Sequence, residues 1–347
     1  MPTFLSLYDT QKPVIALLRV FGLCLDIRSP TKPWNLQTLK PSAFLKFAVF
    51  SSIILLGVVG YNIVFVATLK SLTDLGLVSL SVNMTNVMVI VFVLIDLHVL
   101  LSAVHLFLWF PFGNRFGRFF ADTAELLSRL PFPPAQRRPL FVAQVLLIVL
   151  SLSNLLAISV PNAVFLWSHS ELEWFQIVDM ALQPIWLLPP TVAVVLASSA
   201  TYALYLYAKE LNRSFAATEM STNMRDISDD DPRNAEENEN KCAIIIGEFC
   251  AKHSALCNVT SALDALIGGF MTSLIASFSA TVTLLSYSLL KNGEPLPEEL
   301  AMSTGMARAT AVVALSAQLP QLFSTTWIAA CLSDEVSSLW RKALPEI

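Results

Sequence analysis

Three side chains in the second half of the chain have the spacing of a metal site on a helix. Cys250, His253 and Cys257 lie at positions i, i+3 and i+7, so a helix would place them on one face. Thiolate and imidazole both bind zinc, but a tetrahedral zinc site would need a fourth ligand from elsewhere in the chain. The sequence therefore favours core packing for this face, and a reducing cytoplasm argues against a disulfide.

Catalytic motifs are absent from the sequence. It contains no Walker loop, no Gly-x-Ser-x-Gly motif and no His-Glu-x-x-His motif. Its apolar segments hold neither the Gly-flanked Asp pair nor the Ser/His pair that intramembrane proteolysis would need. We therefore expect no enzymatic activity, no cofactor and no metal ion.

Composition identifies the elements that must position any functional side chain. Hydrophobic residues make up 55% of the 347 residues and charged residues 14%, against about 25% charged in soluble domains. This excludes water-soluble globular and disordered proteins and predicts an all-α, polytopic membrane helical bundle. A span needs about 20 largely apolar residues. Six stretches qualify: roughly Phe47–Thr68, Leu77–Phe110, Leu140–Trp167, Ile177–Tyr207, Ala262–Leu290 and Met302–Leu332.

Basic residues predict the orientation of these spans. Of the 22 Lys and Arg residues, 19 lie in the N-terminal segment, the loops after the second and fourth spans, and the C-terminal tail. Basic residues concentrate on the cytoplasmic side of membrane proteins. We therefore expect a cytoplasmic N-terminus and, with six spans, a cytoplasmic C-terminus. A G-protein-coupled receptor, whose N-terminus faces outward, is excluded.

Several apolar stretches are longer than a membrane is thick. Leu77–Phe110 would extend about 51 Å as a helix, whereas the hydrocarbon core is about 30 Å. The second, fourth, fifth and sixth spans should therefore continue into the cytoplasm and pack there as a bundle of helices.

The acidic run between Asp226 and Glu239 is predicted to be a disordered linker. The predicted organisation is a cytoplasmic N-terminal segment 1–46, spans one to four at 47–207, a cytoplasmic acidic linker and helix at 208–261, spans five and six at 262–332, and a cytoplasmic helical tail at 333–347.

Four short motifs follow one another along the chain. They are Leu17-Leu18-Arg19-Val20-Phe21-Gly22-Leu23; Tyr202 to Phe215, which contains Leu211-Asn212; His253-Ser254-Ala255-Leu256-Cys257-Asn258, with Tyr287 farther along the same helix; and Trp327 to Leu344. In this order, and with this topology, they resemble the insect chemoreceptor superfamily and are closest to its gustatory receptor branch. The resemblance covers almost all of the chain.

The resemblance implies a receptor of the plasma membrane. In that family four subunits form a ligand-gated cation channel, and a seventh helix with a Thr-Tyr-x5-Gln-Phe signature lines the pore. This chain ends at Ile347, before such a helix would begin, so we expect the pore helix to be missing from it. The expected partners are a small-molecule tastant, membrane lipid and related receptor subunits in a homo- or hetero-tetramer, with no nucleic acid.

The family's ligand pocket lies in the outer half of the bundle, and polar or aromatic residues at that depth are the candidates to line it. They are Asn86, Asn154, Gln183, Trp186, Thr283, Tyr287 and Arg308. They would bind a small polar or amphipathic tastant through hydrogen bonds and ring stacking. For each residue the alternative is a hydrogen bond between helices. Arg308 could instead pair with an anion or extend to the membrane interface.

Two other functions remain open from the sequence. A secondary transporter of small solutes is one, although the first three spans do not resemble the last three, as internal repeats would require. The other is a truncated, non-conducting receptor subunit that assembles with related chains.

Overall fold

The computed structural model describes residues 41–74, 134–168, 174–226, 232–290 and 322–338, together with some of the residues within 11–17, 93–106 and 312–319. These parts are helical and contain no β-strand. The elements in chain order are the α-helix α3 (Pro41–Asp74), the short 3-10 helix η3 (Pro134–Gln136), and the α-helices α7 (Arg137–Ser168), α8 (Trp174–Asp226) and α9 (Pro232–Leu290). Residues 322–338 form a further helix near the C-terminus.

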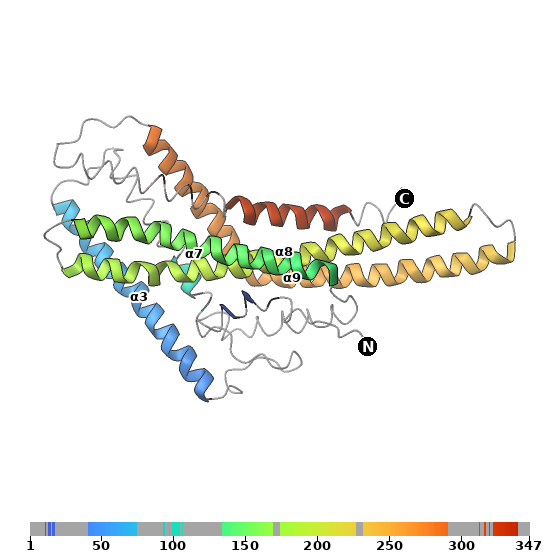
Figure 1. The fold of residues 1–347 in the computed structure, drawn as a ribbon, viewed down its shortest axis with the longest axis horizontal. Helices are drawn as coiled ribbons and strands as arrows, with labels where there is room; N and C mark the ends of the chain where they lie inside the picture. Colours follow the sequence, from blue (N-terminus) through green and yellow to red (C-terminus); the bar gives the residue numbers. More distant parts are fainter. Residues whose placement is uncertain are drawn as a thin grey trace.

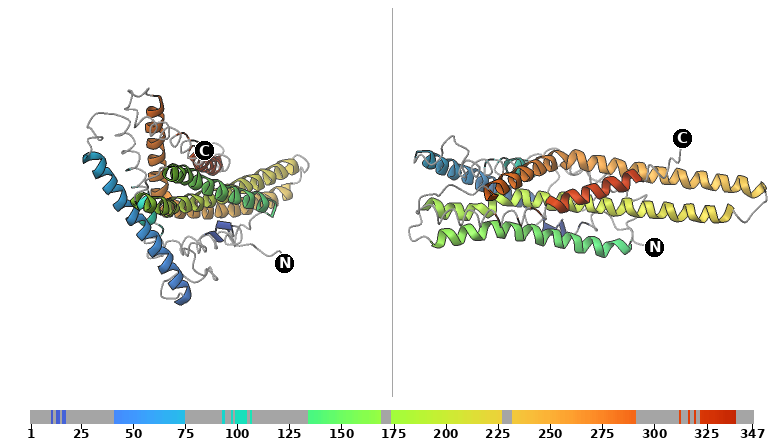
Figure 2. Two further views of the ribbon diagram at one scale, coloured as in Figure 1. Left: turned by 60° about the vertical axis from the view of Figure 1, so that its left-hand side comes forward. Right: turned by 90° about the horizontal axis from the view of Figure 1, so that it is seen from above.

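Helices α8 and α9 are much longer than a membrane is thick. They contain 53 and 59 residues, which corresponds to about 80 Å and about 90 Å. They run in opposite directions, and where they join they project beyond the other helices (Figure 1). The view from above shows the C-terminal helix 322–338 lying against this pair (Figure 2). The prediction that the fourth and fifth spans are parts of longer helices is therefore confirmed.

Among the described residues, four helical segments are long and apolar enough to cross a membrane: Leu45–Val64, Arg137–Leu156, Ala181–Ala217 and Ala243–Ala280. They overlap the first, third, fourth and fifth predicted spans, so the all-helical membrane architecture is confirmed at this level. The second and sixth predicted spans lie largely outside the described residues. Residues 99–104 and 322–332 fall within them and are helical.

The prediction of a disordered acidic linker is wrong for residues 232–239. Helix α9 begins at Pro232 and runs through the acidic residues without a break. Proline is favoured at the first position of a helix because its φ angle is already fixed there and its missing N–H is not needed. Ala, Glu and Lys, which follow it, are strong helix formers. The high charge of this segment is therefore compatible with a helix.

Helix α8 is the centre of the fold. In its candidate span 72% of the residues are buried, compared with 17% in α7 and 33% in α3 and in α9. Its buried face is rich in small side chains: Ala193, Ala197, Ser198, Ser199, Ala200, Ala203 and Ala208. Small residues allow neighbouring helices to approach closely in a membrane. By contrast, α3 and α7 carry many exposed Leu, Val, Ile and Phe side chains, as expected of helices that face lipid.

Candidate functional site

Two predicted ligand-binding residues, Gln183 and Trp186, lie one turn apart on α8 and are both buried. Gln183 is 4% exposed and Trp186 is 2% exposed. The Trp186 ring stacks on Tyr61 of α3, with 4.3 Å between the ring centroids and 20° between the planes. We call Tyr61, Gln183 and Trp186 the α3–α8 site. It combines a flat aromatic surface with an amide that can donate and accept hydrogen bonds.

Two glycines bring α3 close to α8 at this site. A Cβ atom on Gly57 would lie 2.6 Å from Cγ2 of Ile185, and one on Gly60 would lie 3.1 Å from Cδ1 of Leu182. Carbon atoms in good contact are about 3.5–4.0 Å apart, so a side chain at Gly57 could not fit without movement. The absence of side chains at these positions allows Tyr61 to reach Trp186.

Prolines in the same part of α8 leave backbone carbonyls without their usual helical donors. The helix continues through Pro184, Pro189 and Pro190. Proline has no N–H, so Pro189 cannot donate the usual helical hydrogen bond to the carbonyl of Ile185. This turn of α8 can therefore offer a backbone acceptor next to Gln183 and Trp186, which would suit a ligand that carries hydroxyl or amine donors.

The other predicted ligand-binding residues are placed differently. Asn154 is half-buried on α7. Thr283 is exposed on α9, and its hydroxyl donates to the carbonyl of Ser279 at 2.8 Å within the same helix. Tyr287 belongs to α9, but its side chain lies outside the description, as do Asn86 and Arg308 as whole residues. Of the seven predicted residues, the structure thus shows Gln183 and Trp186 together.

A second polar cluster joins α8 to the C-terminal helix. Asn212 is 6% exposed. Its side-chain nitrogen donates to the carbonyl of Glu335 at 3.1 Å, to the Glu335 carboxylate, and to the Ser338 hydroxyl at 3.0 Å. Because a buried amide without partners is costly, these contacts fix the position of the C-terminal helix along α8.

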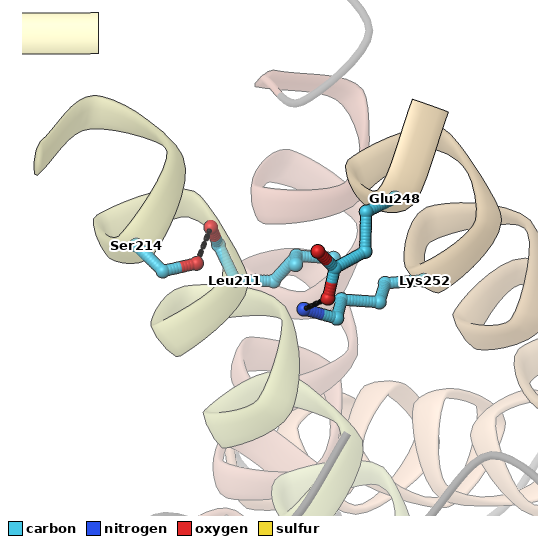
Figure 3. A network of polar contacts seen from close by, with 4 residues as sticks. All are labelled: Leu211, Ser214, Glu248 and Lys252. Atoms are coloured by element: carbon cyan, nitrogen blue, oxygen red, sulfur yellow. Dashed lines mark hydrogen bonds and ion pairs between the residues drawn. The ribbon is translucent and has the colours of Figure 1, made fainter. Parts of the chain in front are cut away.

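Helix α9 bonds to the same turn of the C-terminal helix. His253 is 8% exposed, and its ring forms a hydrogen bond with the backbone of Val336. We call Asn212, His253, Glu335 and Ser338 the three-helix junction. Phe215 of α8 and Phe249 of α9 pack beside it, with ring centroids 4.2 Å apart. Close by, Leu211 and Ser214 of α8 lie beside the Glu248–Lys252 ion pair of α9 (Figure 3).

The cysteines and histidine of the possible zinc site have other roles here. The Cys257 sulfur is 3.7 Å from both ring nitrogens of His253, so it does not lie along the lone pair of either. Cys250 is exposed. In the described part of the chain no three His, Cys, Asp or Glu side chains are grouped to hold a metal ion. These contacts place His253 and Cys257 in the packing between helices.

No known family model matches this chain, and no characterised protein is significantly similar to it.

Sequence-based prediction missed Tyr61 and the contacts of the three-helix junction. A signal for the first was present, because Gly57, Gly60 and Tyr61 share one face of an apolar helix, and small residues at such spacing indicate close helix contact. The pairing of Asn212 with Glu335 had no such signal. The two residues are separated by 123 positions, and neither stands out locally.

Proposed function

We propose that this chain is a gustatory-type chemosensory receptor subunit of the plasma membrane, which binds a small polar or amphipathic molecule. In this proposal it has six spans with both termini in the cytoplasm. It assembles into homo- or hetero-tetramers with related receptor subunits through its cytoplasmic helices. In the family that it resembles, ions flow through a pore lined by the seventh helix, which is not among the six predicted spans.

One observation carries the proposal. Three of the four motifs on which the resemblance rests come together in space, although they are far apart in the sequence. Leu211-Asn212 contributes Asn212, the motif that opens with His253 contributes that histidine, and the segment from Trp327 to Leu344 contributes Glu335 and Ser338. Because these motifs meet in one contact region, there is a physical reason for them to occur together in this order. This supports the interpretation that they are parts of one architecture.

The geometry of α8 supports a route from ligand binding to the rest of the assembly. Trp186 of the α3–α8 site and Asn212 of the three-helix junction lie on the same uninterrupted helix, 26 residues and therefore about 39 Å apart. A ligand that prefers one position of α3 relative to α8 would favour that conformation at the expense of others. A rigid α8 would carry such a shift to the junction.

Calcium imaging tests the proposal in cells that lack chemoreceptors of their own. The chain is expressed alone and together with a seven-helix gustatory receptor, and sugars, bitter alkaloids and carbon dioxide are applied. We expect a ligand-dependent response. Gln183→Leu keeps the side-chain volume but removes the amide, so it should shift the half-maximal concentration at least tenfold. Gln136→Leu, in η3, is the matched control and should leave it unchanged.

Surface labelling of the chain separates failure of the protein from failure of the proposal. If the chain reaches the cell surface but neither expression condition gives a response, the receptor proposal is contradicted. Saturable uptake of a labelled solute without current would favour the transporter instead. An N-terminal epitope tag that becomes accessible to antibody only after permeabilisation is expected from the proposed orientation, and a tag accessible on intact cells would overturn that orientation.

A further inference from the structure

An amide from the N-terminal part of the chain lies in the protein interior between α7 and α8. Gln11 is 5% exposed, and Val14, three residues later, is 1% exposed. Gln144 of α7 and Ser199 of α8, which contact Gln11, are both fully buried. A glutamine is rarely buried without several hydrogen bonds, because desolvating its amide is costly. A buried Gln11 side chain therefore needs hydrogen-bond partners close to it.

Gln11 obtains these partners from two different helices. Its side-chain oxygen accepts a hydrogen bond from the Ser199 hydroxyl at 2.6 Å and another from the Gln144 amide at 3.0 Å. Its side-chain nitrogen donates to the backbone carbonyl of Ser199 at 3.3 Å. One oxygen atom is thus the common acceptor for a donor on α7 and a donor on α8. This arrangement connects the two helices through a third segment.

We propose that Gln11 is an intramolecular latch that holds α7 against α8. When Gln11 is seated, the Gln144 and Ser199 side chains are bonded to the same acceptor, which sets the spacing of their helices. When it withdraws, the acceptor shared by the two helices is lost, so the contact between α7 and α8 around Gln144 and Ser199 loosens or admits water. The inference does not depend on the proposed receptor function.

The neighbouring residue on α8 shows that the contact is specific to one face. Ser198 is also buried, at 2% exposed, but its hydroxyl forms no hydrogen bond with the residues that the structure describes. Ser198 and Ser199 have the same side chain, adjacent positions and similar burial. They differ in whether they contact the latch, and so they form a matched pair for experiments.

Hydrogen exchange of the purified full-length chain in lipid nanodiscs tests the latch. Gln11→Met keeps the length of the side chain and removes its amide. We expect exchange in the parts of α7 and α8 around Gln144 and Ser199 to become at least tenfold faster, while the part of α3 around Gly57 stays unchanged. Ser199→Ala should produce the same local change in a smaller degree, and Ser198→Ala should produce none.

Every other outcome would contradict the proposal that Gln11 is a latch. Unchanged exchange in Gln11→Met would show that the hydrogen bonds do not hold the helices together. Faster exchange throughout the chain would show that Gln11 supports the whole fold and does not control one pair of helices. If Gln11→Met does not fold, Ser199→Ala and Ser198→Ala are compared by themselves, and equal exchange in these two variants would overturn the proposal.

Discussion

Replacement of Gly57 by alanine is the sharpest test of the contact between α3 and α8. The added methyl carbon would lie 2.6 Å from Cγ2 of Ile185 and 3.4 Å from its Cβ. Ile185 is branched at Cβ, so its Cγ2 atom cannot swing away without a change of rotamer. Relief of the clash requires α3 to move by about 1 Å, because carbon contacts are favourable near 3.5–4.0 Å. That movement would part Tyr61 from Trp186.

The expected loss of stability follows from two opposing contributions. Overpacking of a close-packed interface costs about 1–3 kcal/mol. Alanine is a better helix former than glycine by about 0.5–1 kcal/mol. The net destabilisation of Gly57→Ala should therefore be about 1–2 kcal/mol, which corresponds to a fall in the apparent Tm of a few degrees.

Thermal unfolding of the purified chain in detergent, followed by tryptophan fluorescence at one scan rate, measures this change. Gly60→Ala should cost less, because its nearest atom is the flexible end of Leu182 at 3.1 Å. Gly269→Ala, which meets nothing within 4 Å, is the control and should be neutral or stabilising. Adding Ile185→Ala to Gly57→Ala removes the clashing atom, so the two changes should cost less together than the sum of their separate effects. An additive result, or equal effects at all three glycines, would show that Gly57→Ala does not clash with Ile185.

Four further substitutions give expected outcomes in the same unfolding assay. Asn212→Asp places a second carboxylate against Glu335, so it should destabilise the chain at neutral pH and regain stability as the pH falls and one carboxyl becomes protonated. Trp186→Ala should cost about 3–5 kcal/mol, because Trp186 is 2% exposed and stacked, whereas Trp327→Ala, at a ring 61% exposed, should cost far less. Glu248→Gln breaks an exposed ion pair and should leave the Tm unchanged, and a measurable fall would contradict the low value expected of surface pairs.

The locations of the apolar helices could be predicted from the sequence, whereas their ends could not. The predicted span Leu140–Trp167 lies inside α7, and Ile177–Tyr207 lies inside α8. The high charge density of the acidic segment after Pro232 predicts a linker, whereas the helix propensity of its residues predicts a helix. The structure shows a helix. In a helix without an apolar face, neither hydropathy nor periodicity indicates where the structure continues.

The candidate site was predictable in part. Gln183 and Trp186 are candidates because polar and aromatic groups are unusual in an apolar helix; both are buried, and Trp186 stacks on Tyr61 of α3. Thr283 had the same signal, but it lies on an exposed surface and bonds to its own helix. A polar residue in an apolar stretch is thus a candidate, and the direction in which it points depends on packing that a single helix does not determine.

The amino-acid sequence was sufficient to predict a helical architecture and to locate segments apolar enough to span a membrane. These properties follow from local chemistry, because each backbone group in a membrane helix is satisfied by a residue four positions away. The stacking of Tyr61 on Trp186, the bond from Asn212 to Glu335 and the bond from Ser199 to Gln11 across 188 positions became visible only in the tertiary structure. Such pairs depend on how whole helices pack. The spacing of Gly57 and Gly60 indicates that α3 has a close neighbour, but it does not specify which helix or which ring lies there.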